Sequence, residues 1–150
     1  MKPLIVLLIS FSLALLSTKL LLNNFEIALS ARIAMAIMLV FTAIAHFAFT
    51  GGMEMMIPDF IPFKKAMVYF TGFIEICASI GLLIVHLKIL TAWLLIVFFI
   101  LLIPANIKAA VRHIDYQKGT FDGNGVTYLW FRIPLQILFI LWTYLAAIKF

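Results

Sequence analysis

Residues 31–50 have the sequence ARIAMAIMLVFTAIAHFAFT, an apolar run that begins beside Arg32 and contains His46 near its end. A helix that crosses a membrane needs about 20 consecutive, mostly apolar residues. Four further segments meet this requirement, at residues 3–22, 66–85, 89–107 and 127–147. The sequence therefore predicts an all-α membrane protein, folded as an antiparallel bundle of five transmembrane helices in one domain over residues 1–150.

The composition supports a lipid environment. Hydrophobic residues make up 66% of the chain and charged residues 11%, whereas a soluble domain is about half apolar and about a quarter charged. A chain of 150 residues leaves much of its surface exposed, so lipid must cover many of these side chains. The net charge of +5 forms no basic run and predicts contact with anionic headgroups, with no nucleic acid as a partner. Cys77 is the only cysteine, which excludes an internal disulfide and a thiolate metal site, and we expect no metal.

The first apolar segment has two interpretations. Lys2 precedes an apolar run, as in a secretory signal peptide. The run continues past the usual length of such a signal and lacks an A-x-A cleavage site. We therefore expect residues 3–22 to be a retained helix.

The segments between the helices differ in character. Residues 23–30 and 86–88 are short, which predicts antiparallel neighbours. Residues 51–65, GGMEMMIPDFIPFKK, combine two glycines and two prolines with bulky apolar residues, which is typical of a segment at the membrane interface or one that re-enters the membrane. Residues 108–126 are the only substantially polar stretch, with a turn at DGNG.

The distribution of Lys and Arg predicts the orientation. Five spans place the N-terminus and the two longer loops on one side, with Lys2, Lys64, Lys65, Lys108, Arg112 and Lys118. The other side carries Lys19, Arg32, Lys88 and Lys149. Because cytoplasmic loops carry the excess of positive residues, we expect the N-terminus in the cytoplasm and the C-terminus outside.

Polar residues recur every four positions in three of the spans. The three sets are Thr42, His46 and Thr50; Thr71, Glu75 and Ser79; and Tyr128, Arg132 and Gln136. Residues four apart share one face of a helix, and lipid offers them no hydrogen bonds. We therefore expect the three stripes, with Asn106 of the fourth span, to face one vestibule that opens toward the two longer loops. The segment MEMMIPDFIPF would close its mouth.

Glu75 would lie deepest, near the middle of the membrane. An ionised carboxylate there must become neutral, meet water or pair with a cation. Arg132 is the first candidate partner and His46 the second. The predicted ligand-binding or proton-handling residues are His46, Glu75, Asn106, Arg132 and Gln136, with Thr42, Thr50, Thr71 and Tyr128 in support. The alternative is structural, because buried polar residues also fix the packing of membrane helices; no catalytic residue is identified.

Several short motifs follow one another in order along the chain. They are His46-Phe47, the prolines of IPDFIP, TGFIEI at residues 71–76, PAN at residues 104–106 and RIPLQ at residues 132–136. Together they resemble the motifs of the DoxX-like family of small bacterial membrane proteins. The resemblance covers residues 31–147 and implies a four-helix core, to which residues 3–22 add an extra N-terminal helix. It also implies the cytoplasmic (inner) membrane of a bacterium as the location.

The resemblance implies little about the reaction. Some relatives are linked to membrane redox complexes, and others of similar architecture assist the assembly of membrane proteins. Our first hypothesis is that the bundle binds a small amphiphile, quinone-like or lipid-like. Service as a subunit of a membrane redox complex belongs to this hypothesis, and a quinone is then the cofactor to consider. The second is an assembly factor or structural subunit for another membrane protein. The third, a proton-coupled carrier, ranks last because only one opening is evident.

Overall fold

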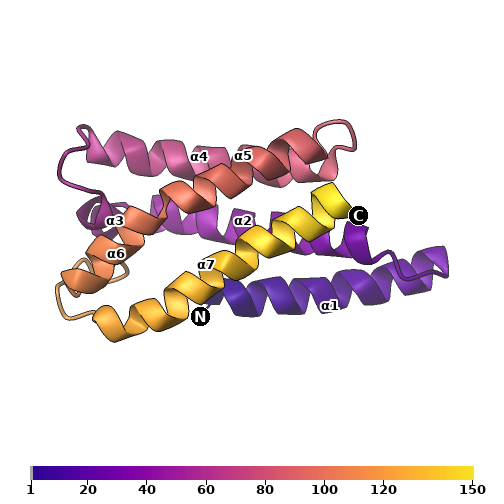
Figure 1. Ribbon diagram of the computed structural model, residues 1–150, viewed down its shortest axis with the longest axis horizontal. Coiled ribbons are helices and arrows are strands. Elements are labelled where there is room, and N and C mark those ends of the chain that lie inside the picture. The colour runs from indigo at the N-terminus through magenta and orange to yellow at the C-terminus, as the bar shows by residue number, and fades with distance from the viewer. Residues whose placement is uncertain (1) are drawn as a thin grey trace.

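A computed structural model describes residues 2–150, and it shows the predicted all-α bundle (Figure 1). Five of its helical segments are long and apolar enough to cross a membrane. They are α1 (Lys2–Leu22), α2 (Ile27–Ala48), α4 (Lys64–Leu83), the joined α5 (Lys88–Leu101) and α6 (Ile103–Val111), and α7 (Leu129–Tyr144) with its short extensions η1 (Val126–Tyr128) and η2 (Leu145–Lys149). The prediction of a multi-pass membrane protein is confirmed.

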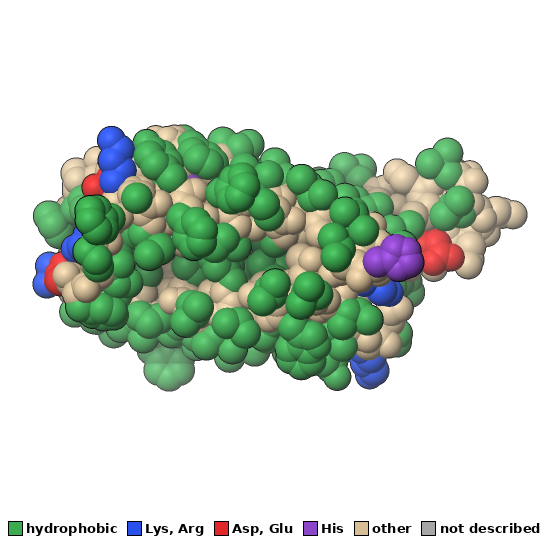
Figure 2. All heavy atoms as spheres, turned by 90° about the horizontal axis from the view of Figure 1, so that it is seen from above, with side chains coloured by type: hydrophobic (Ala, Val, Ile, Leu, Met, Phe, Trp, Pro, Cys, Tyr) green, Lys and Arg blue, Asp and Glu red, His purple; other side chains and the backbone are tan. Residues whose placement is uncertain are grey.

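The surface of the bundle is apolar around its middle and charged at its ends. Large apolar side chains are exposed on several helices: Leu13, Phe73 and Leu94, which lie on three different helices, are each about three-fifths exposed. In Figure 2, hydrophobic side chains cover the flank while Lys, Arg, Asp, Glu and His gather at the two ends. Soluble monomers rarely expose a continuous apolar surface of this kind, so lipid is the solvent for the flank.

The core forms where α2 packs between α1 and α4, and where α7 packs against α5. Small residues, including Ala34 and Ala92, occupy buried positions of α2 and α5. Small side chains allow the backbones of neighbouring helices to pack closely. The residues that make up the core cluster are Leu7, Ala34, Met35, Met38, Leu39, Ala78, Leu82, Ala92, Leu95, Phe98, Phe99, Phe139 and Ala147. Helix α1 joins this core through Leu7, and the Phe11 ring meets the Trp142 ring edge-to-face at 5.1 Å.

The predicted topology is confirmed by the position of the loops. Lys2 Nζ donates to Gln117 Oε1 at 3.4 Å, which places the start of α1 beside the polar loop. The short helix α3 (Thr50–Met56) packs against α6, and both lie at one end of the bundle in Figure 1. We call this end, which carries Lys2, α3 and residues 112–125, the loop end. The links 23–26 and 84–87 lie at the opposite end (Figure 1).

The fourth span is broken rather than continuous. Helix α5 ends at Leu101, and α6 begins at Ile103 with Pro104 in its first turn. Proline has no N–H to donate and clashes with the preceding turn of an α-helix. The break therefore leaves carbonyls in the last turn of α5 without the hydrogen bonds that a continuous helix would give them.

Residues 57–63 are held against α6 by one acidic side chain. Asp59 forms ion pairs with Lys64 at 2.8 Å, Lys108 at 2.8 Å and Arg112 at 3.2 Å. Lys108 Nζ also donates to the Ile57 carbonyl at 2.5 Å. The hydrogen bonds from Lys108 and Lys64 hold the pKa of the Asp59 carboxyl well below its ordinary value. The segment predicted to close a vestibule is therefore fastened to the loop end of α6.

Candidate functional site

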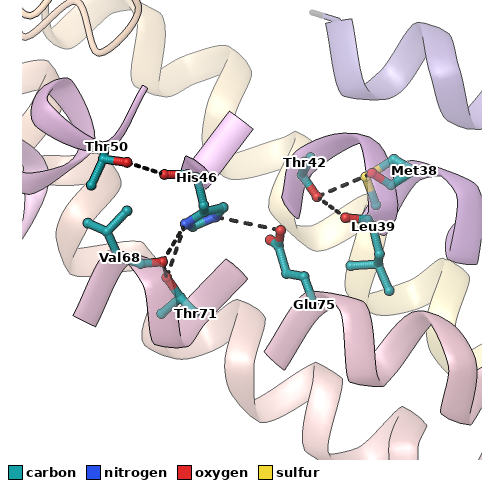
Figure 3. Close-up of polar contacts among 8 residues, drawn as sticks. All are labelled: Met38, Leu39, Thr42, His46, Thr50, Val68, Thr71 and Glu75. Atoms are coloured by element: carbon teal, nitrogen blue, oxygen red, sulfur yellow. Dashed lines mark hydrogen bonds and ion pairs between the residues drawn. The ribbon is translucent and has the colours of Figure 1, made fainter. Parts of the chain in front are cut away.

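The candidate site begins with a buried pair on facing helices, His46 on α2 and Glu75 on α4 (Figure 3). His46 Nε2 lies 3.5 Å from Glu75 Oε2, and the two side chains are 13% and 5% exposed. Glu75 Oε2 makes no hydrogen bond within the part of the chain that the structure describes. His46 is therefore the single cationic or potentially cationic side chain within 4 Å of this carboxyl among residues 2–150.

The other nitrogen of His46 is fixed by α4. Nδ1 lies 3.2 Å from the Val68 carbonyl oxygen and 3.1 Å from Thr71 Oγ1. The Thr71 hydroxyl is itself 2.8 Å from the same carbonyl, to which it donates. Figure 3 shows the ring held between this Val68–Thr71 turn and the Glu75 carboxyl. Three groups on one helix thus set the orientation of the imidazole.

Helix α4 can approach His46 this closely because residue 72 has no side chain. A Cβ added to Gly72 would lie 2.9 Å from His46 Cβ and 3.3 Å from the ring of Phe47. Phe47 in turn stacks on Tyr69 of α4, with 5.7 Å between ring centroids. The TGFIEI motif therefore supplies both the contact surface for His46 and the carboxyl opposite it.

The hydroxyl groups expected to support the site bond mainly within their own helices. Thr42 Oγ1 donates to the Met38 and Leu39 carbonyls. Ser79, which belongs to the α4 stripe but is not one of the predicted supporting residues, likewise donates its hydroxyl to the Ile76 carbonyl. Thr50 does not continue the α2 stripe but begins α3, and its hydroxyl donates to the His46 carbonyl at 2.8 Å. Of the predicted supporting hydroxyls, Thr71 is the one that contacts an ionisable side chain directly.

A second polar cluster joins α6 to α7. Arg132 Nη1 donates to Asn106 Oδ1 at 3.1 Å, and the guanidinium lies over the Tyr128 ring at 5.2 Å from its centroid. Among residues 2–150, no carboxylate lies within ion-pair distance of Arg132. The expected ion pair between Arg132 and Glu75 is therefore not formed, because α7 presents Arg132 to α6 and not to α4.

Gln136 makes the kind of contact that the structural alternative predicts. It is buried, and its Nε2 donates to the Phe99 carbonyl at 2.6 Å. Phe99 lies in the last turn of α5, next to the break before Pro104. The amide of Gln136 therefore satisfies a carbonyl of the broken helix, while Asn106 accepts a hydrogen bond from Arg132.

The predicted site residues thus divide into two clusters. His46, Thr71 and Glu75 join α2 to α4, and Asn106, Tyr128 and Arg132 join α6 to α7 and η1. No hydrogen bond or ion pair connects the two clusters among residues 2–150. In their direct contacts, the residues expected to face one vestibule therefore form two polar clusters.

Arg132 and Tyr128 also line a cavity of about 460 Å³ at the loop end. Residues that were not predicted as site residues also line it, and the polar ones are Lys2, Asp115, Tyr116, Gln117 and Asn124. The Asp115 carboxylate accepts backbone N–H bonds from Gln117 and Lys118 and lies 3.8 Å from Lys118 Nζ. These loop residues follow no helical period, and their place beside Arg132 depends on the fold of residues 112–125. The DGNG turn was the one signal that this loop folds back.

A family model described as "Domain of unknown function (DUF8561)" matches residues 35–147. The matched range includes the His46–Glu75 pair and the Asn106–Arg132 contact, and it begins after α1. No curated protein and no solved structure matches the chain.

Proposed function

Since the chain belongs to the family described as "Domain of unknown function (DUF8561)", a description that assigns no activity, we propose the function of the protein from the geometry of its own residues. The protein binds a small amphiphile whose polar head enters the loop-end cavity and whose apolar part lies along the helices. The observation that carries this proposal is Arg132, a cation without a carboxylate partner among residues 2–150 that lines a cavity of about 460 Å³.

The charge of the cavity selects the head group. Arg132 uses one nitrogen for Asn106. Lys2 donates to the Gln117 side chain and forms no ion pair among residues 2–150. The one acidic group of the lining, Asp115, is already engaged by two backbone N–H groups and Lys118. A guanidinium binds carboxylates and phosphates through parallel hydrogen bonds. The favoured head therefore carries acceptor oxygens, as a phosphate or a carboxylate does, and a quinone with its two carbonyls is the weaker fit.

The size and position of the cavity fit the same ligand. Pockets for small molecules have volumes of about 300–1,000 Å³, and this cavity lies within that range. Arg132 is in the first turn of α7, where the span meets the polar loop. A lipid-like molecule with its head at this depth would keep its tail in the hydrocarbon region.

The location and the wider role remain proposals as well. The loop end carries most of the Lys and Arg residues, so we propose that it faces the cytoplasm of a bacterium, with the protein in the inner membrane. The likeness of the HF, TGFIEI, PAN and RIPLQ motifs to the DoxX-like family remains a prediction. If the protein is a subunit of a redox complex, its partner proteins would have to contain the electron-carrying cofactors.

Native mass spectrometry of protein extracted gently from membranes tests the binding. We expect an adduct with an anionic or acceptor-rich head on the wild-type protein, reduced at least about tenfold in Arg132→Gln, which corresponds to the loss of about 1.4 kcal/mol of binding free energy. Arg112→Gln is the matched control, because Arg112 is exposed, pairs with Asp59 and does not line the cavity. Equal adducts on all three proteins, or none on any, would contradict the proposal. The absence of an adduct together with copurification of a membrane protein would favour the assembly factor.

A further inference from the structure

The buried pair of His46 and Glu75 takes no part in the cavity, and its geometry points to a second activity. We propose that this pair is a proton-exchange site within the membrane, which holds one mobile proton between His46 Nε2 and Glu75 Oε2. The inference does not rest on ligand binding at the cavity.

The contacts of His46 Nδ1 indicate that this nitrogen carries a hydrogen. The Thr71 hydroxyl has one hydrogen and donates it to the Val68 carbonyl at 2.8 Å. Nδ1 lies 3.2 Å from that same carbonyl. A bare Nδ1 would bring its lone pair against the carbonyl oxygen, so Nδ1 carries a hydrogen and donates it. This leaves Nε2 either as an acceptor or as the second N–H of an imidazolium.

Besides the hydrogen on Nδ1, the pair holds one further proton. If Nε2 is an acceptor, the Glu75 carboxyl must be a neutral acid, because an ionised Oε2 facing a bare nitrogen would be buried without any donor. If Nε2 carries a hydrogen, His46 is cationic and Glu75 is its counter-ion. Both forms hold two protons in total and no net charge, which is the arrangement that a low-dielectric interior tolerates.

The two forms interconvert by one proton transfer. The Oε2–H bond breaks, its electron pair stays on the carboxylate, and the proton forms a bond with the lone pair of Nε2. The 3.5 Å between Nε2 and Oε2 is longer than the distance of an ordinary hydrogen bond. The transfer therefore needs the two side chains to move slightly closer, or one water between them. Because Oε2 has no other hydrogen-bond partner among residues 2–150, it is free to exchange this proton with Nε2.

The surroundings leave the pair isolated from other charges. Helices α2 and α4 also pack against α1, α3, α5, α7 and η2. The charged residues on those elements are Lys2, Lys19, Glu54, Lys88, Arg132 and Lys149. Within residues 2–150, none of them forms an ion pair with His46 or Glu75, and no tyrosine hydroxyl or cysteine thiol bonds to either. The proton of the pair is therefore governed by these two side chains.

His46 is the partner that lies nearer to the membrane surface. His46 lies in the last turn of α2, near the loop end, and is the more exposed partner. Glu75 lies in the middle of α4 and is almost completely buried. Protons therefore enter and leave through the imidazole, and Glu75 is the inner end of the site.

Nitrogen NMR of the full-length protein in lipid nanodiscs counts the protons. The double variant His86→Gln, His113→Gln leaves His46 as the sole histidine, since the chain has three, and both replaced residues are exposed. Infrared spectroscopy of the same sample detects the carboxylic acid, which Glu75→Gln assigns by its loss. We expect Nδ1–H together with one more proton, on Nε2 or on the carboxyl. A count of one, with Nε2–H, a bare Nδ1 and an ionised Glu75, would overturn the proposal, and so would a count of three.

Transfer to deuterated buffer then tests exchange. The proton shared by Nε2 and Oε2 is expected to be replaced by deuterium, while the buried side-chain amide of Gln136, which donates to Phe99, exchanges more slowly. A shared proton that persists as long as the Gln136 amide protons would show a structural pair and would also overturn the inference. Neither the proton count nor the deuterium exchange depends on binding of an amphiphile at Arg132. The two proposals can therefore fail separately.

Discussion

Gly72 of α4 packs directly against His46 of α2 at the buried pair: a Cβ at residue 72 would lie 2.9 Å from His46 Cβ. His46 Cβ is bonded to the backbone and has little freedom to move aside. Gly72→Ala is therefore expected to push the two helices apart and to destabilise the protein by about 1–3 kcal/mol. Unfolding in mixed micelles of mild detergent and dodecyl sulfate measures this free energy.

Gly51→Ala is the matched control, because a Cβ at Gly51 meets nothing within 4 Å. Its effect should be neutral or slightly stabilising, since alanine restricts the unfolded chain and favours the helix. Equal destabilisation by both variants would show that the close contact at Gly72 is not what the substitution disturbs.

Gln136→Leu removes the donor to the Phe99 carbonyl while keeping a side chain of similar volume. The carbonyl belongs to the last turn of α5 and loses its partner, so we expect a loss of about 0.6–2 kcal/mol in unfolding free energy. Thr143→Val provides the comparison, because the buried Thr143 hydroxyl donates to the Phe139 carbonyl of its own helix. The same unfolding assay should show a smaller loss for Thr143→Val; the reverse order would contradict the role given to Gln136.

Trp142 connects three helices. Its Nε1 donates to the Ala31 carbonyl on α2 at 3.0 Å, and its ring meets Phe11 of α1 edge-to-face. Trp142→Phe deletes the hydrogen bond and is expected to weaken the packing of α1 by about 1 kcal/mol. Hydrogen exchange of the α1 amides measures this effect. Trp130→Phe, at a side chain that is 85% exposed, is expected to leave the exchange of α1 unchanged.

Asp59 makes the attachment of residues 57–63 depend on pH. The pKa of its carboxyl is lowered from 3.8 chiefly by the hydrogen bonds from Lys108 and Lys64. Because the folded protein favours the ionised form, the stabilisation is fully present above pH 3.8 and is lost as the pH falls toward the folded-state pKa.

The variant Asp59→Asn measures this contribution. The difference in unfolding midpoint between the wild type and Asp59→Asn is expected to be constant from neutral pH down to about pH 5 and to shrink at lower pH. High salt should reduce it as well, since the Asp59 carboxylate is exposed and screened. A difference that grows on acidification would show that the ion pairs of Asp59 do not hold the loop.

The five spans could be predicted because hydropathy and length determine which segments cross a membrane. Pro104 accounts for the break at Leu102. The fourth span was predicted to end at residue 107, whereas α6 continues it to Val111. Thr50 was assigned to the second span, whereas the chain turns at Phe49 and begins α3. Helix ends are set by local hydrogen bonds that hydropathy does not report.

The polar stripes were also predictable, since residues four apart must share a helix face. Which stripe meets which could not be derived, because periodicity fixes a face within one helix but not the rotation of its neighbours. His46 faces Glu75 as the second candidate, whereas Arg132 turns to Asn106. The loop residues of the cavity were missed for a similar reason, since Asn124 and Lys2 are distant in sequence and follow no period.

The break between α5 and α6 has a consequence for the evolution of this chain. The interrupted helix leaves the Phe99 carbonyl without its usual backbone donor, and the side-chain amide of Gln136 on α7 donates a hydrogen bond to it. A descendant that replaces Pro104 and straightens the helix gains nothing from an amide at position 136, and one that keeps the bend pays heavily for losing it. The two positions are thus expected to covary, so that lineages inherit either both the imino acid and the amide or neither.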